Sequence, residues 1–252
     1  MNTACDKHFN FIRKPLVVDI FGVGMGRFFS FLMLQLVKMT SSLFYRYEEN
    51  WLNIKKEQVN WSEIRLIVFL NHTSLFEPIF LRVAPSNFLW MISRKLVVPG
   101  ADITLQRPIL GRFFKFLIPG AIPITRKKDE SWQKFLAHIK PSSLVAILPE
   151  GRMKRSSGFD KDGLPMSVRG GIADILKLID DGKALFVYSG GLHHIQTPGQ
   201  KLPKLFQRVK VNLEVLNISS YKAGLKEKSF KAFKANIISD LNFRLKNSVP
   251  KD

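Results

Sequence analysis

Short apolar runs alternate with amphipathic stretches over most of this 252-residue chain. Several of the apolar runs are rich in β-branched or aromatic residues and almost free of charge, which is typical of strands buried on both faces. These predicted strands span residues 64–70, 88–92, 121–125, 144–148, 184–188 and 211–216. Stretches with helical periodicity lie at 76–84, 108–117, 129–139, 166–181 and 226–246. The alternation predicts one α/β domain with a largely parallel central sheet flanked by helices.

The N-terminal part of the chain differs from the rest. Residues 1–14 form a polar, basic tail, and residues 15–47 are mostly apolar. Asp19 and Arg27 would each cost roughly 2.5–3.5 kcal/mol near the centre of a bilayer, which argues against a membrane span. We therefore expect residues 15–47 to form a helical pair embedded in one leaflet, with basic side chains reaching the headgroups. A pair of helices packed on the core of the domain is the alternative.

Charge is the most unusual feature of the composition. The chain has 39 Lys and Arg against 20 Asp and Glu, a formal net charge of +19 at pH 7. Such an excess fits nucleic acid, an acidic lipid surface or a phosphate-bearing substrate. The 21 Phe against 4 Trp and 4 Tyr suit acyl chains better than stacked bases, which makes nucleic acid the less favoured partner. The single cysteine, Cys5, excludes an internal disulfide and fits the cytoplasmic side of a membrane.

Candidate chemistry lies where the first predicted strand ends, in the sequence VFLNHTSLFEP. His72 and Glu77 are five positions apart, so they would point about 140° apart on one helix and can meet only if His72 precedes the helix. A carboxylate on one ring nitrogen fixes the tautomer of the imidazole and prepares the other nitrogen to accept a proton from a hydroxyl. The alternative is a capping box over Ser74–Glu77, in which Glu77 binds only the backbone.

The chain contains four short sequence motifs that follow one another in a fixed order. The motif N-H-x4-D is matched by Asn71, His72 and Glu77, with Glu in place of the commoner Asp. A Lys, then P-x-x-G and G-x-I-x-V-x-R, are matched by Lys95, Pro108, Gly111, Gly120, Ile122, Ile124 and Arg126. The motif F-P-E-G-T-R and a later basic residue with glycine are matched by Pro149, Glu150, Gly151, Arg169, Gly170, Gly171 and Ala173. Over residues 64–190 the chain thus resembles the lysophosphatidic acid acyltransferase (glycerolipid acyltransferase) family.

This resemblance implies an acyltransferase domain over residues 48–252 that needs no cofactor and no metal. His72 would deprotonate the acceptor hydroxyl, Glu77 would orient His72, and backbone amides near the following helix would stabilise the tetrahedral oxyanion. The donor would be acyl-CoA or an acyl carrier protein, and the acceptor lysophosphatidic acid, giving phosphatidic acid. The enzyme would be associated with a membrane, attached to its cytoplasmic face without spanning it. The substrate-binding positions implied are Asn71, Lys95, Arg126, Glu150, Gly151 and Arg152.

Two departures from the family pattern leave the acceptor open. Arg152 and Met153 occupy the usual Thr and Arg positions of the F-P-E-G-T-R motif, and Lys154 and Arg155 follow. The family pattern ends with a strand that carries the motif V-P-V, and residues 187–190 of this chain have the sequence VYSG there. Another lysophospholipid or an amino-acid lipid is therefore an alternative acceptor. The rivals from other classes are a membrane-binding relative without activity and a basic nucleic-acid-binding protein.

Overall fold

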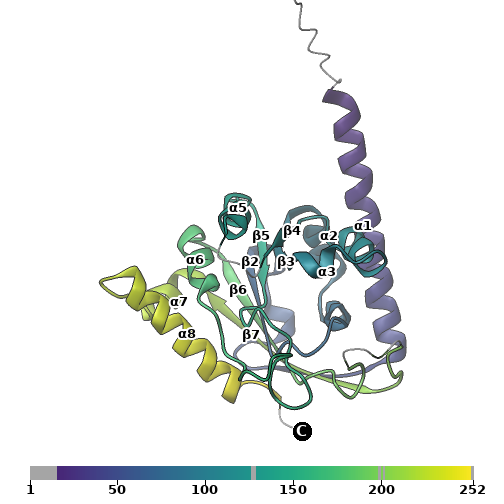
Figure 1. Cartoon of the computed structure of the whole chain (residues 1–252). Coiled ribbons are helices and arrows are strands. Elements are labelled where there is room, and N and C mark those ends of the chain that lie inside the picture. The colour runs from purple at the N-terminus through teal and green to yellow at the C-terminus, as the bar shows by residue number, and fades with distance from the viewer. Residues whose placement is uncertain (1–15, 126–128, 198–199, 201, 251–252) are drawn as a thin grey trace, which may run out of the picture.

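A seven-stranded sheet forms the centre of the molecule, in the order β1-β7-β6-β2-β5-β3-β4, with helices on both faces (Figure 1). The structure is a computed structural model that describes residues 16–125, 129–197, 200 and 202–250, with side chains described from Gly24 onward. The strands are β1 (Arg46–Trp51), β2 (Ile64–Leu70), β3 (Leu96–Ala101), β4 (Ala121–Ile124), β5 (Leu144–Ile147), β6 (Lys183–Ser189) and β7 (Arg208–Asn217). All neighbouring pairs are parallel except β6 and β7, so the predicted α/β fold with a largely parallel sheet is confirmed.

The helices are distributed between and after the strands. The α-helices are α1 (Leu16–Phe44), α2 (Ser86–Lys95), α3 (Asp102–Leu105), α4 (Leu110–Leu117), α5 (Ser131–Ala137), α6 (Gly171–Leu178), α7 (Ile218–Gly224) and α8 (Phe230–Asn247). Three short 3-10 helices are η1 (Lys56–Gln58), η2 (Trp61–Glu63) and η3 (Glu77–Val83). The segment η3 follows β2 directly along the chain, so it begins at the carboxyl edge of the sheet.

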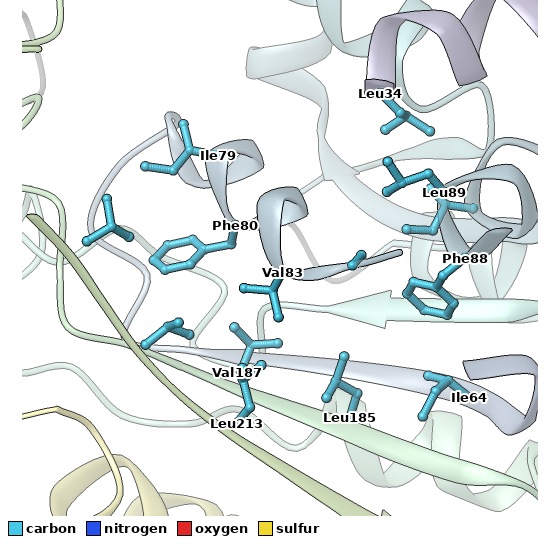
Figure 2. Close-up of a cluster of buried hydrophobic side chains, with 14 of the residues drawn as sticks. Leu34, Ile64, Ile79, Phe80, Val83, Phe88, Leu89, Leu185, Val187 and Leu213 are labelled. Carbon is cyan, nitrogen blue, oxygen red and sulfur yellow. The ribbon is translucent and has the colours of Figure 1, made fainter. Parts of the chain in front are cut away.

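Two buried apolar clusters lie on opposite faces of the sheet. Along β6, Leu185 and Val187 belong to one cluster, whereas Phe186 and Tyr188 belong to the other, as the two-residue period of a strand requires. The first cluster packs the sheet against α1, η3 and α2, and Figure 2 shows Val83 of η3 above Val187. The second cluster packs it against α5, α6 and α8. Helices therefore cover both faces of the sheet.

Residues 88–92, predicted as a strand, lie inside helix α2. Phe88, Leu89 and Ile92 are buried, whereas Trp90 is partly exposed, a helical rather than an alternating arrangement. The apolar run therefore covers one side of a helix that packs on the sheet. The prediction failed because five apolar residues in a row do not distinguish a buried strand from a packed helix.

The expected N-terminal helical pair is instead one continuous helix, α1, and Arg46 already begins strand β1. Figure 1 shows the start of α1 extending beyond the body of the domain, while its later turns lie beside α2. Among the described residues, no helix combines the length and apolar character that crossing a bilayer requires. The predicted second helix is thus the continuation of α1, and only residues 46 and 47 of the segment belong to an edge strand of the sheet.

Candidate active site

The site begins at a turn after β2 that is stabilised by Glu150. Asn71 adopts the left-handed conformation with φ 66°, which Asn tolerates better than most residues. Its N–H donates to Glu150 Oε1 at 2.6 Å, and the N–H of His72 donates to the same oxygen at 3.3 Å. The side-chain amide of Asn71 donates to the Ser189 carbonyl at 2.8 Å. The turn is therefore tied to the segments that end the neighbouring strands β5 and β6.

This turn places His72 beside Glu77, the first residue of η3. His72 Nδ1 lies 2.5 Å from Glu77 Oε2, and the two side chains are 14% and 9% exposed. The other oxygen of Glu77 accepts the N–H of Thr73 at 2.8 Å and of Ser74 at 3.4 Å. Both interpretations of the sequence thus describe the same carboxylate, which caps the backbone through one oxygen and binds the imidazole through the other.

Burial and two neighbouring carboxylates shift the pKa of His72 in opposite directions. Burial lowers the pKa of His72, but the charge and the hydrogen bond of Glu77, together with the charge of Glu150, outweigh burial and raise the pKa above the usual histidine value. Burial raises the pKa of Glu150 to about 7, although the N–H groups of Asn71 and His72 favour its charged form. The Glu150 side chain is only 1% exposed. Glu150 therefore titrates near neutral pH, next to the histidine whose pKa it influences.

The backbone amides around His72 already have acceptors. The N–H groups of residues 71–74 donate to Glu150 or Glu77. The N–H of Phe76 donates to Ser74 Oγ at 3.1 Å. The expected oxyanion donors are backbone amides near the following helix, and these particular N–H groups could serve only by leaving their present acceptors. Their geometry instead fixes the position of the imidazole.

His72 and Glu77 line an apolar cavity of about 650 Å³. Its walls come from both α-helical and strand segments, including Phe80, Ile92, Val98, Phe114 and Leu117. Among the described residues, the ionisable groups that line the cavity are His72, Glu77, Arg169 and Asp174. A cavity of this size with few polar groups is typical of small-molecule sites. The arrangement suits a substrate with a long hydrocarbon part and a reactive group at the histidine.

The substrate-binding residues predicted from the sequence are placed differently from one another. Gly151 lines the cavity with φ +61°, and a Cβ at this position would lie 3.3 Å from Arg169 Cδ. Asn71 and Glu150 are buried in the turn. Lys95 ends α2 in an exposed position outside the cavity lining. Arg126 lies outside the described residues.

Arg152 binds to the loop that follows the F-P-E-G-T-R motif. Its Nη1 lies 2.5 Å from Asp160 Oδ2, and its Nη2 donates to the Pro165 carbonyl at 3.4 Å. Asp160 is buried and also accepts the N–H groups of Asp162 and Leu164. Arg152 is not part of the cavity lining. The structure therefore pairs this arginine with its own loop and does not bring its charge to His72.

Three cavity residues in or near α5 and α6 had no role predicted from the sequence. Arg169 and Asp174 line the cavity, and so does Trp132, whose indole N–H donates to Asp174 Oδ2 at 3.1 Å. A Cβ at position 171 would lie 2.8 Å from the Trp132 ring, so Gly171 allows this contact. The available signal in the sequence was the pair Gly170 and Gly171, which cap and begin α6. In the described part of the chain, no group of three or more His, Cys, Asp or Glu is arranged to hold a metal ion.

The site is a histidine–carboxylate pair at the carboxyl edge of a mostly parallel sheet, open to an apolar cavity, an arrangement that can take a proton from a hydroxyl. A model of the family named Acyltransferase matches residues 51–188, more than half of the chain, and the protein belongs to this family. The predicted acyltransferase resemblance is confirmed at this level.

Among solved structures, the chain is similar to the crystal structure of the 1-acyl-sn-glycerophosphate (LPA) acyltransferase PlsC from Thermotoga maritima. The identity is 16%, the match covers 92% of this chain and 91% of that chain, and the TM-score is 0.48. No curated protein matches the chain.

Proposed function

We propose that this acyltransferase moves a fatty acyl group from acyl-CoA or acyl carrier protein to the free hydroxyl of lysophosphatidic acid, giving phosphatidic acid. We further propose that it works on the cytoplasmic face of a membrane. The observation that carries the proposal is the 2.5 Å contact between His72 and Glu77 in the wall of an apolar cavity. The cavity suits an acyl chain, and the net charge of +19 complements phosphate groups and acidic lipids.

The proposed reaction uses the two ring nitrogens of His72 for different tasks. Nδ1–H donates to Glu77, which leaves Nε2 to accept the proton of the acceptor hydroxyl as its oxygen attacks the thioester carbonyl. The carboxylates of Glu77 and Glu150 stabilise the imidazolium that forms. When the tetrahedral intermediate collapses, the carbon–sulfur bond breaks and Nε2 returns the proton to the departing thiolate.

A different acceptor is the second candidate. Arg152 is paired with Asp160, so recognition of a phosphate would depend on other cations, of which Arg169 lines the cavity. A lysophospholipid with a larger headgroup, or an amino-acid lipid, would present different charges to this region. The acceptor is therefore tested with a panel rather than with one compound.

The test is acyl transfer by the purified protein in mixed micelles, with labelled acyl-CoA and either lysophosphatidic acid or another lysolipid. His72→Ala is expected to lower kcat by about 10²–10⁴-fold, as loss of a general base does. His138→Ala is the matched control, because His138 is an exposed histidine just after α5. An undiminished kcat in His72→Ala would refute the mechanism.

The acceptor panel separates the remaining possibilities. Preference for another lysolipid would overturn the lysophosphatidic acid assignment and leave acyl transfer in place. If acyl-CoA supports no turnover, acylated carrier protein is supplied instead. Binding to vesicles without turnover of either donor would identify a membrane-binding relative without activity.

A further inference from the structure

Helices α1 and α4 contact each other, and both carry large apolar side chains that are exposed. We call this surface the α1–α4 face and define it by Phe28, Phe29, Leu32, Ile109, Phe113 and Phe116, all of which are exposed. Ile109 is 86% exposed and Phe116 is 62% exposed. Large apolar side chains that gather on adjoining elements mark interaction sites more often than ordinary solvent-facing surface.

The two helices are held together from within. Ser30 of α1 is fully buried and donates its hydroxyl to the Leu117 carbonyl, at the end of α4, at 2.9 Å. Leu34 of α1 and Phe114 and Leu117 of α4 line the cavity. The two helices thus contribute to the cavity wall as well as to the exposed apolar surface. A second helix next to α1 was predicted within residues 15–47; in the structure α4 lies next to α1 instead.

The charges around this face identify its partner. Arg27 lies on α1, Arg112 and Lys115 on α4 and Arg107 just before α4, and all four are exposed. Neither α4 nor the part of α1 from Gly24 to Phe44 contains an acidic residue. Phenylalanines interspersed with cations are typical of helices that lie in a bilayer interface. Each well-placed cation adds about 1 kcal/mol of attraction to an anionic membrane surface, a factor of about five in binding.

We infer that α4 is a second membrane-docking helix, which acts with α1 to seat the α1–α4 face on a bilayer surface rich in anionic lipid. The inference rests on the proposed function in one respect, since it assumes that the enzyme works on a membrane. It adds that docking requires residues of the catalytic domain more than seventy positions after the start of α1. The segment 15–47 alone is then insufficient for docking.

The experiment measures co-sedimentation of the full chain with vesicles of phosphatidylcholine, with or without phosphatidylglycerol. Phe113→Ser with Phe116→Ser is expected to weaken binding to the anionic vesicles by at least about tenfold, given the value of burying two phenylalanines. Arg112→Gln with Lys115→Gln is expected to weaken binding by about tenfold or more and to reduce its sensitivity to salt.

Matched controls lie on the opposite face of the sheet, in helix α8 or just before it. Phe243→Ser removes an exposed phenylalanine, and Lys228→Gln with Lys231→Gln removes two exposed lysines. These changes should leave vesicle binding intact. Acyl transfer in detergent micelles should stay at the wild-type level in the Phe113 and Phe116 variant, which shows that it folds, while transfer on vesicles falls.

Each outcome separates this inference from the proposed function. If the wild type does not sediment with anionic vesicles, the membrane association itself is wrong. If the wild type binds and the α4 variants bind equally well, only the inference about α4 is wrong. If the wild type is a dimer in solution and the α4 variants are monomers, the face is an interface between copies of this chain and the inference is overturned.

Discussion

Replacing Glu77 with glutamine preserves the shape of the side chain and removes its charge and one acceptor. In the wild type, Oε1 accepts the backbone N–H groups of Thr73 and Ser74, and Oε2 accepts the Nδ1–H of His72. Glutamine has one oxygen for both tasks. If the oxygen stays with the backbone, the amide NH₂ faces Nδ1, which must then be an acceptor. The imidazole proton moves to Nε2, and the base is lost.

The magnitude follows from these bonds. A hydrogen bond to a charged group contributes about 1.5–3 kcal/mol, which corresponds to roughly 10–150-fold in rate if the bond strengthens the reacting imidazole. The corresponding Asp→Asn change in a serine protease, which reverses the tautomer, lowers kcat by about 10⁴. We therefore expect Glu77→Gln to lower kcat by about 10²–10⁴-fold. KM for the acceptor should change little, because Glu77 acts on His72.

The assay is steady-state acyl transfer in micelles, combined with thermal unfolding of each variant. Glu77→Asp serves as the comparison, because it keeps the charge on a side chain one methylene shorter and should retain much more activity than Glu77→Gln. If Glu77→Gln folds normally and keeps a kcat within a few-fold of wild type, Glu77 does not hold the tautomer and the reasoning is refuted.

Two further predictions concern Glu150 and Gly120. Glu150→Gln keeps an acceptor for the turn but removes a charge that raises the pKa of His72. Since His72 acts as a base when it is unprotonated, the acidic limb of the kcat/KM–pH profile should move to lower pH. An acidic limb that stays in place or moves to higher pH would contradict this. In Gly120→Ala, the added Cβ would lie 1.8 Å from the Leu96 carbonyl oxygen, so we expect the free energy of unfolding to fall by about 1–3 kcal/mol and Tm to be lower. Gly224→Ala, with nothing within 4 Å, should leave Tm unchanged, and equal Tm values for both variants would refute the packing argument.

Five strands, including the edge strand β4, could be predicted from the sequence, whereas β1 and β3 could not. β2, β5 and β6 are almost uniformly apolar because both faces of the sheet are covered. β1 has the sequence RYEENW and alternates between exposed and partly buried residues, so its composition is that of a polar segment. β3 contains Pro99 and Gly100, which normally indicate a turn. Tertiary pairing overrides local preference at both positions.

The candidate site was predictable where neighbours in sequence meet, and less so where distant segments meet. His72 and Glu77 are joined by one turn, and their spacing is enough to expect a contact. The bond from Glu150 to the backbone of Asn71 joins residues 79 positions apart and depends on the pairing of β2 with β5. The pairing of Arg152 with Asp160 depends on the path of a loop, for which the sequence has no periodic signal.

The order of strands in the sheet has a consequence for how the chain is assembled. The first strand, β1, pairs with β7, the last, although Glu48 and Arg208 are 160 positions apart. His72, Glu77 and Glu150 are all synthesised before β7, yet β1 has no strand to join until β7 has formed beside β6. Contacts across such separations form late because a long loop must close first. A chain that stops before Arg208 therefore leaves the N-terminal helix without its strand connection to the sheet, however complete the catalytic turn is.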